Sequence, residues 1–198
     1  MTDHPETFLN HLRTAAVGVL ERIPEQLKPE IYTLAFNIWR VDYDYRHPYV
    51  DIGYNTESQY RLERRPEDPG EARWNYACWI LEGFEKLGNV PEDPAGRPVY
   101  EAEVKQLGAW FDSEDEEDEG EIDAKSDLLR LHFYDAVIDL ARHLHADGVI
   151  EKTFGRPIPV VVFDMDCPGW EVHATEYANP PGVIEEFMAW QQAQLPGS

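Results

Sequence analysis

The sequence is poor in basic residues. Lysine and arginine number 17 against 39 acidic residues, which gives a formal net charge of −22. A surface of this sign repels the phosphate backbone of nucleic acids and the headgroups of anionic membranes, and it attracts basic proteins. We therefore expect no direct contact with nucleic acid or membrane, and we expect a basic protein as the partner.

Cysteine and long apolar runs are also scarce. Cys78 and Cys167 are the only cysteines and lie far apart in the chain, which favours reduced thiols over a disulfide framework or a zinc site. No apolar run approaches the roughly 18 residues of a membrane span, and the first residues are polar, unlike those of a signal peptide. The chain is therefore predicted to be cytoplasmic.

What the sequence does contain is enough apolar surface for one core. At 198 residues and 42% hydrophobic content, the chain suits a single domain. Apolar residues at helical spacing predict helices over residues 5–23 and 126–148. Alternation predicts a hairpin of strands at 31–40 and 50–54, and an apolar run predicts a buried strand at 158–163. The elements intermix without βαβ alternation, so we expect a single α+β domain over the whole chain. Its sheet is expected to be mixed or antiparallel, with flanking helices.

Weaker signals suggest three further features. Thr56 and Gln59 match a capping box that opens a short helix. Residues 74–87 follow a helical pattern that ends at Gly88. The run at 179–181, Asn-Pro-Pro, is expected to cap a last helix.

A dense acidic run separates the two halves of the chain. Like charges repel one another and do not pack, so the segment at 112–125 is predicted to be a mobile loop. Its simplest role is to solvate the surface. The acids are Asp112, Glu114, Asp115, Glu116, Glu117, Asp118, Glu119, Glu121 and Asp123.

Two sharper roles for the acidic run are open. An EF-hand register with Gly120 at position six places Ser126 at position twelve, where a bidentate Glu is required, so a calcium site of that type is disfavoured. The other role is contact with a basic protein. The predicted hairpin tip carries a similar acidic and aromatic set, and such sets give fast association and anchoring area. The tip residues are Asp42, Tyr43, Asp44 and Tyr45.

The apolar strand at 158–163 is followed by Asp164 and Asp166, the spacing of aspartate-nucleophile phosphotransferases of the haloacid-dehalogenase type. The resemblance ends there. Cys167 and Pro168 follow in place of a Gly-Thr or Gly-Val pair, and no Lys or Arg occurs after Asp166 to bind phosphate. The pair is therefore interpreted as polar residues at the end of a strand.

Other catalytic or metal-binding patterns are weak. His143 and His145 are two residues apart and cannot share one face of a helix, and His132 and His143 are poorly placed to bind one metal. No Gly-rich phosphate loop occurs, so no metal and no cofactor is predicted. An enzyme site assembled from distant residues is the alternative to a binding protein. Its candidate residues are Asp164, Asp166, Glu171 and His173.

Two segments carry a resemblance to a bacterial family of uncharacterised domains. They are residues 53–57, with an Asn-Thr-Glu turn after a strand, and residues 73–79, with two tryptophans after an arginine. In that family a hydrophobic strand ending in acids and an Asn-Pro helix follow, which would correspond to residues 164–166 and 179–180. The resemblance implies no activity and no catalytic residue.

The charge and size of the chain are also similar to those of immunity proteins from polymorphic toxin systems. We therefore predict a non-enzymatic acidic binding protein, an immunity-type neutraliser of a basic toxin or another basic protein. Two alternatives stay open: a small-ligand-binding or hydrolytic enzyme near Asp164, and a DNA mimic whose carboxylates imitate phosphates along an ordered ridge.

Overall fold

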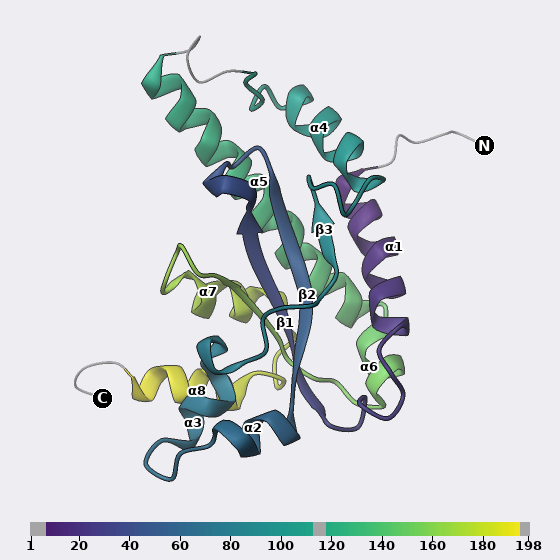
Figure 1. Cartoon of the computed structure of the whole chain (residues 1–198), viewed down its shortest axis with the longest axis vertical. Helices are drawn as coiled ribbons and strands as arrows, with labels where there is room; N and C mark the ends of the chain where they lie inside the picture. Colours follow the sequence, from purple (N-terminus) through teal and green to yellow (C-terminus); the bar gives the residue numbers. More distant parts are fainter. Residues whose placement is uncertain (1–6, 113–117, 195–198) are drawn as a thin grey trace.

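The computed structural model describes residues 7–112 and 118–194. Its four-stranded sheet has the order β3-β2-β1-β4 (Figure 1). The strands are β1 (Ile31–Arg40), β2 (Pro48–Thr56), β3 (Lys86–Gly88) and β4 (Val160–Asp164). β1 pairs antiparallel with β2 and parallel with β4, so the sheet is mixed. The predicted α+β fold, its hairpin and its buried strand are confirmed.

Helices flank the sheet. The described residues form α1 (Phe8–Glu21), α2 (Glu57–Glu63), α3 (Pro69–Trp74), α4 (Gly96–Gln106), α5 (Glu119–Ala146), α6 (Val149–Phe154), α7 (Trp170–Ala178) and α8 (Glu185–Ala193). Two short 3-10 turns, η1 (Val41–Tyr43) and η2 (Tyr76–Cys78), complete them.

The two faces of the sheet carry different cores. Leu34, Phe36 and Ile38 of β1 point into the main core, where α1, α4 and α5 contribute residues such as Leu12, Tyr100 and Phe133. The opposite face holds a smaller, aromatic cluster that α3, η2 and α8 help to form; α3 and α8 lie next to each other at the lower left of Figure 1. It contains Tyr32, Ala35, Trp74, Trp79, Val161, Phe163 and Phe187. Both faces of β1 and β4 are therefore buried.

Side chains of α7 cover the free edge of β4. The Thr175 hydroxyl accepts a hydrogen bond from the Val162 N–H at 3.1 Å. The Asn179 amide both accepts from the Val160 N–H at 2.8 Å and donates to the Val160 carbonyl at 2.7 Å. Because edge strands expose unpaired backbone groups, these contacts protect the sheet from pairing with another chain.

Several predicted boundaries are wrong. Asn179 ends α7 and does not cap α8, because its amide is committed to β4. Residues 74–87 are not one helix: they contain η2 and the start of β3, and the aromatic side chains that suggested a helix reach the second core from separate turns. The capping box is confirmed only in its first half, since Thr56 accepts from the Gln59 N–H at 3.1 Å.

The loop predicted at residues 112–125 is also shorter than expected, because its last residues belong to a helix. α5 begins at Glu119 and not at Ser126, with the Asp118 carboxylate accepting from the Gly120 N–H at 3.0 Å as its N-cap. Acidic residues at a helix N-terminus interact favourably with the helix dipole, which compensates for their mutual repulsion. Glu119, Glu121 and Asp123 therefore occupy a helix, while residues 114–117 lie outside the described part of the chain.

Candidate functional site

Asp164 lies at the buried end of β4, where the register places it beside Ile38 of β1. Arg40, two residues further along β1, donates from Nη2 to Asp164 Oδ2 and from Nη1 to Asp166 Oδ2 at 2.6 Å. The Tyr134 hydroxyl of α5 donates to Asp164 Oδ2 at 2.5 Å. One guanidinium thus binds both aspartates of the Asp-x-Asp pair.

The environment of Asp164 excludes nucleophilic attack. The residue is 1% exposed, and its second oxygen accepts from the Asp166 N–H at 2.8 Å. Burial and the hydrogen bond to Asp164 raise the pKa of Tyr134, so its hydroxyl remains a donor at neutral pH. The interpretation of Asp164 and Asp166 as structural strand-end residues fits this geometry, with Arg40 as the partner that the sequence did not reveal.

Glu171 and His173 lie on α7 and take part in other contacts. Glu171 Oε2 accepts from the Gly169 N–H at 2.6 Å. The His173 ring is exposed and lies 4.5 Å from the Tyr177 ring, measured between centroids. No described contact joins either residue to Asp164. The four alternative catalytic residues are therefore near one another in sequence but do not form one site.

The hairpin tip, residues 41–47, begins with a strained turn. The Asp44 N–H donates to the Val41 carbonyl at 2.9 Å, and the two central residues, Asp42 and Tyr43, have φ values of 53° and 62°. Glycine or asparagine normally fills such positions, since other side chains cost about 1–2 kcal/mol there. Tyr43 is nevertheless 76% exposed, so the strain presents an aromatic ring to solvent.

The other two acid-aromatic residues of the tip turn inward. Asp44 accepts hydrogen bonds from Arg46 Nε at 2.9 Å and Nη2 at 2.7 Å. Burial opposes ionisation of Asp44, but these bonds outweigh it and lower the pKa of its carboxyl group. The Tyr45 ring lies under the Arg40 guanidinium, 4.7 Å from its centroid. Of the four contact residues predicted at the hairpin tip, only Asp42 and Tyr43 are exposed.

The hairpin tip and the segment before the acidic run lie side by side. Arg46 Nη1 donates to the carbonyls of Phe111 and Asp112, both at 3.3 Å, and its guanidinium stacks over the Phe111 ring. His47 contacts the Trp110 ring edge-on at 6.3 Å. The hairpin tip and residues 110–112, which the sequence analysis considered separately, are therefore in contact.

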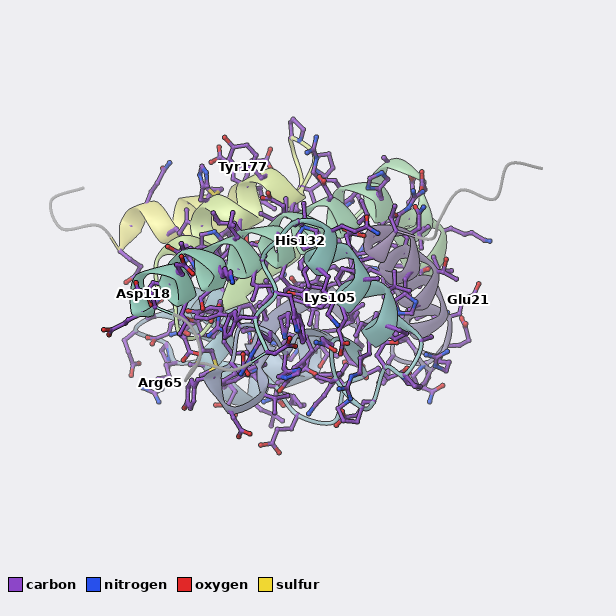
Figure 2. All side chains as sticks on the ribbon, turned by 90° about the horizontal axis from the view of Figure 1, so that it is seen from above. Glu21, Arg65, Lys105, Asp118, His132 and Tyr177 are labelled. Carbon is purple, nitrogen blue, oxygen red and sulfur yellow. The ribbon has the colours of Figure 1, made fainter. Side chains whose placement is uncertain are left out.

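These contacts define what we call the acidic end of the molecule. It lies where the tip adjoins α5 in Figure 1, and Figure 2 views the molecule from that side, with Asp118 labelled. Its exposed described residues are Asp42, Tyr43, Asp112, Asp118, Glu119, Glu121 and Asp123. Glu114, Asp115, Glu116 and Glu117, which were predicted to belong to the same surface, lie outside the described residues.

A separate pocket of about 540 Å³ is lined by residues of α5, α6 and the end of α7. His145 and Asn179 line it together with Arg142, Glu151 and Tyr177. The Asn179 amide donates to the carbonyls of Val160 and Thr175, which fixes its oxygen toward His145 Nε2 at 3.1 Å. His145 must therefore donate from Nε2, and its Nδ1 is the unprotonated nitrogen.

This arrangement predicts a pH dependence of stability. Burial lowers the pKa of His145, and the hydrogen bond to Asn179 opposes that effect only in part. The unfolded chain therefore takes up a proton near pH 6.5, before the folded protein does, and stability is lost as the pH falls below that value. Urea unfolding between pH 7 and pH 5 should show a smaller loss in His145→Gln than in the wild type. An equal loss in both would contradict the assignment.

A buried His–Asp pair between α1 and the loop before α4 was not predicted from the sequence. His11 Nε2 lies 3.0 and 2.9 Å from the two carboxylate oxygens of Asp93. Asp93 also accepts from the N–H groups of Gly88 at 3.0 Å and Gly96 at 2.9 Å. With its oxygens so engaged, the pair holds β3 and α4 to α1 and is a structural feature.

The described residues were also searched for metal-ligating groups and for membrane-spanning helices. Within residues 7–112 and 118–194, no group of three or more His, Cys, Asp or Glu residues could hold a metal ion. The same part of the chain contains no helix with the length and hydropathy needed to cross a bilayer. Cys78 and Cys167 are both free thiols.

Comparisons with known proteins returned no relative. No protein-family model matches the chain, and neither the curated proteins nor the solved structures contain a significant match.

Proposed function

We propose that the protein is a non-enzymatic binding protein whose acidic end neutralises a basic partner, in the manner of an immunity protein bound to a basic toxin. The observation that carries the proposal is the strained, exposed Tyr43 beside Asp42 at the hairpin tip. Backbone strain persists where the surrounding structure enforces it, and it concentrates at functional positions.

The surroundings of Tyr43 suit a protein interface. Exposed tyrosine gives a large contact area at low cost in conformational entropy, and it recurs among the residues that dominate binding energy. Asp112 lies beside the tip, where its carbonyl accepts a hydrogen bond from Arg46, and the first turns of α5 carry further acids on ordered backbone. Long-range attraction between this surface and a basic protein accelerates association and weakens with salt.

The proposal predicts opposite effects of one substitution on stability and on binding. Tyr43→Gly removes the left-handed strain and should stabilise the fold by about 1 kcal/mol. It also removes the anchoring ring and should weaken partner binding at least tenfold. Urea unfolding measures the first effect, and surface plasmon resonance with the captured partner measures the second. Tyr177→Ala is the matched control, because Tyr177 is 57% exposed on α7 and away from the tip.

The partner must first be captured. Immobilised wild-type protein should retain a basic protein from the source cell's lysate at low salt and release it at raised salt. A variant with the nine acids from Asp112 to Asp123 changed to their amides should not retain that protein. Equal capture by the wild type, the amide variant and Tyr43→Gly would sink the proposal, since the contact would then lie elsewhere.

The start of α5 also supports a second candidate, a DNA mimic. Glu119, Asp123 and Asp127 recur every four residues on one ordered helix, and all three are exposed. Such an ordered row of acids was not expected, because the segment at 112–125 was predicted to be a mobile loop. Added duplex DNA distinguishes the two candidates: it should displace the captured partner if the acids imitate phosphates, and it should have no effect beyond its ionic strength if they do not.

A further inference from the structure

Two polar side chains on the outer face of the sheet are buried without partners. Asn37 of β1 is 2% exposed, and neither its amide nitrogen nor its amide oxygen has a hydrogen-bond partner among the described residues. Asp51 of β2 is 7% exposed, and its Oδ1 is also unpaired. The two residues face each other across the hairpin in the β1–β2 register. Buried groups of this kind are costly, and a ligand is one of the few reasons a fold retains them.

A pocket of about 500 Å³ opens beside Asp51, while Asn37 is not among the residues that line it. Asp51 lines it, and alternation along the strands places Asn37 on the same face of the sheet. The walls are aromatic: Trp39, Tyr49 and Phe84 all line the pocket. The Phe84 ring lies so close over Gly53 that a Cβ there would come within 2.7 Å of it. A pocket with apolar walls and a few convergent polar groups is the usual form of a small-molecule site.

The charges around the pocket favour a cation. Glu82 lines it, and Glu92 lies 3.8 Å from Lys86 Nζ, so three carboxylates including Asp51 face a single ammonium group. That ammonium already lies 4.8 Å from the centroid of the Tyr49 ring, which shows that this wall accepts a cation. Burial raises the pKa of Asp51 to about 6, with Lys86 opposing and Glu92 reinforcing the shift. The Asp51 carboxylate is therefore ionised at neutral pH and lacks a close donor.

We propose that this pocket binds a small primary amine, whose ammonium group donates to Asp51 Oδ1. Its apolar body then lies between Trp39, Tyr49 and Phe84. The ammonium supplies the donor that Asp51 Oδ1 lacks, and the aromatic walls bind the rest of the ligand through apolar and cation–π contact. This site lies apart from the acidic end, and the inference does not rest on the proposed function.

The test compares three probes of one shape. Phenethylamine is the ammonium probe, 2-phenylethanol its neutral analogue and 3-phenylpropanoate its anionic analogue. Titration calorimetry at pH 7.5, together with amide shifts of β2 in NMR spectra, should show binding of the amine, at least tenfold weaker binding of the alcohol and none of the acid. Binding of the acid in preference to the amine, or no shift of β2 amides by any probe at millimolar concentration, would overturn the proposal. If no probe shifts the β2 amides, a water molecule between Asn37 and Asp51 is enough to satisfy their unpaired polar atoms, and no ligand is needed.

Substitution of Asp51 separates a ligand site from a structural one. Asp51→Asn removes the buried charge and should reduce amine affinity at least tenfold. The variant should also melt about 2–6 °C higher than the wild type, because it no longer buries a carboxylate, so loss of folding cannot explain loss of binding. Glu85→Gln is the matched control, since the Glu85 carboxylate pairs with Arg22 outside the pocket. Unchanged amine affinity in Asp51→Asn would contradict the assignment.

The affinity for the amine should also depend on pH. Lowering the pH through about 6 protonates Asp51 in the free protein, while the ligand ammonium stays charged, so amine binding should weaken about tenfold per pH unit below that value. The charged groups that face Asp51 are Lys86 and Glu92, with Glu82 at the pocket wall. Affinity that is constant from pH 7.5 to pH 4.5 would overturn the role of Asp51.

Discussion

Arg40→Met should destabilise the fold by about 3–5 kcal/mol, the largest effect we expect from any single substitution. The substitution retains the apolar stem but removes the guanidinium that binds Asp164 and Asp166. Asp164 would then be an uncompensated buried charge, held only by the Tyr134 hydroxyl and one backbone N–H. Urea unfolding followed by circular dichroism measures the loss as a lower midpoint at unchanged slope.

An exposed arginine provides the control. Arg142 pairs with Asp139 at 3.2 Å on α5, and its side chain is 61% exposed, so Arg142→Met should cost less than 1 kcal/mol. Adding Asp164→Leu to Arg40→Met should recover part of the lost stability, because the unpaired charge is then absent. A loss of under 1 kcal/mol in Arg40→Met would show that water or another group solvates Asp164 and that the cluster is not what fixes β4 to β1.

Gly96→Ala should cost about 3 kcal/mol, although alanine favours a helix more than glycine does. Gly96 opens α4 directly against the His11–Asp93 pair, and a Cβ at this position would lie 2.5 Å from His11 Nε2 and closer still to Asp93 Oδ2. The pair must separate to admit it. Burial opposes ionisation of Asp93, but the hydrogen bonds from His11, Gly96 and Gly88 outweigh it and lower the pKa of its carboxyl group. Breaking them leaves a buried carboxylate poorly solvated.

Gly18→Ala in α1 is the matched control for that prediction. A Cβ at Gly18 meets only the flexible end of Arg22, at 3.2 Å, so this substitution should stabilise the protein by about 0.5–1 kcal/mol. Thermal and urea unfolding of both variants give the comparison. Similar stabilisation by Gly96→Ala would mean that His11 and Asp93 rearrange at no cost and do not hold α4 in place.

Local sequence patterns predicted much of the fold, but they predicted none of the side-chain contacts at its buried polar sites. The hairpin, β4 and most of α5 follow from apolar periodicity over a few residues. α7 was missed because its buried residues, Ala174, Thr175 and Ala178, are too small to produce an apolar stripe. α4 was missed because its first turn contains a glycine and a proline, which also signal an irregular connection.

The site contacts were missed for a different reason. Arg40 and Asp164 are 124 residues apart, and His11 and Asp93 are 82 apart, so only the assembled sheet and helices bring them together. Asn37 and Asp51 belong to the correctly predicted hairpin, and alternation places both on one face. Their lack of partners, however, depends on what α3, η2 and the following loop place over that face, which no short-range pattern reveals.

The central position of β1 has a consequence for how the chain is made. β1 pairs with β4 in parallel, yet Arg40 leaves the ribosome 124 residues before Asp164. At ordinary rates of synthesis this interval is on the order of 6–25 s, far longer than a hairpin needs to form. Any β1–β2 hairpin that forms during that time has one edge of β1 open and Arg40 without its acids. The nascent chain therefore passes through a stage in which its middle strand is an edge strand, and pairing with another chain competes with completion of the sheet.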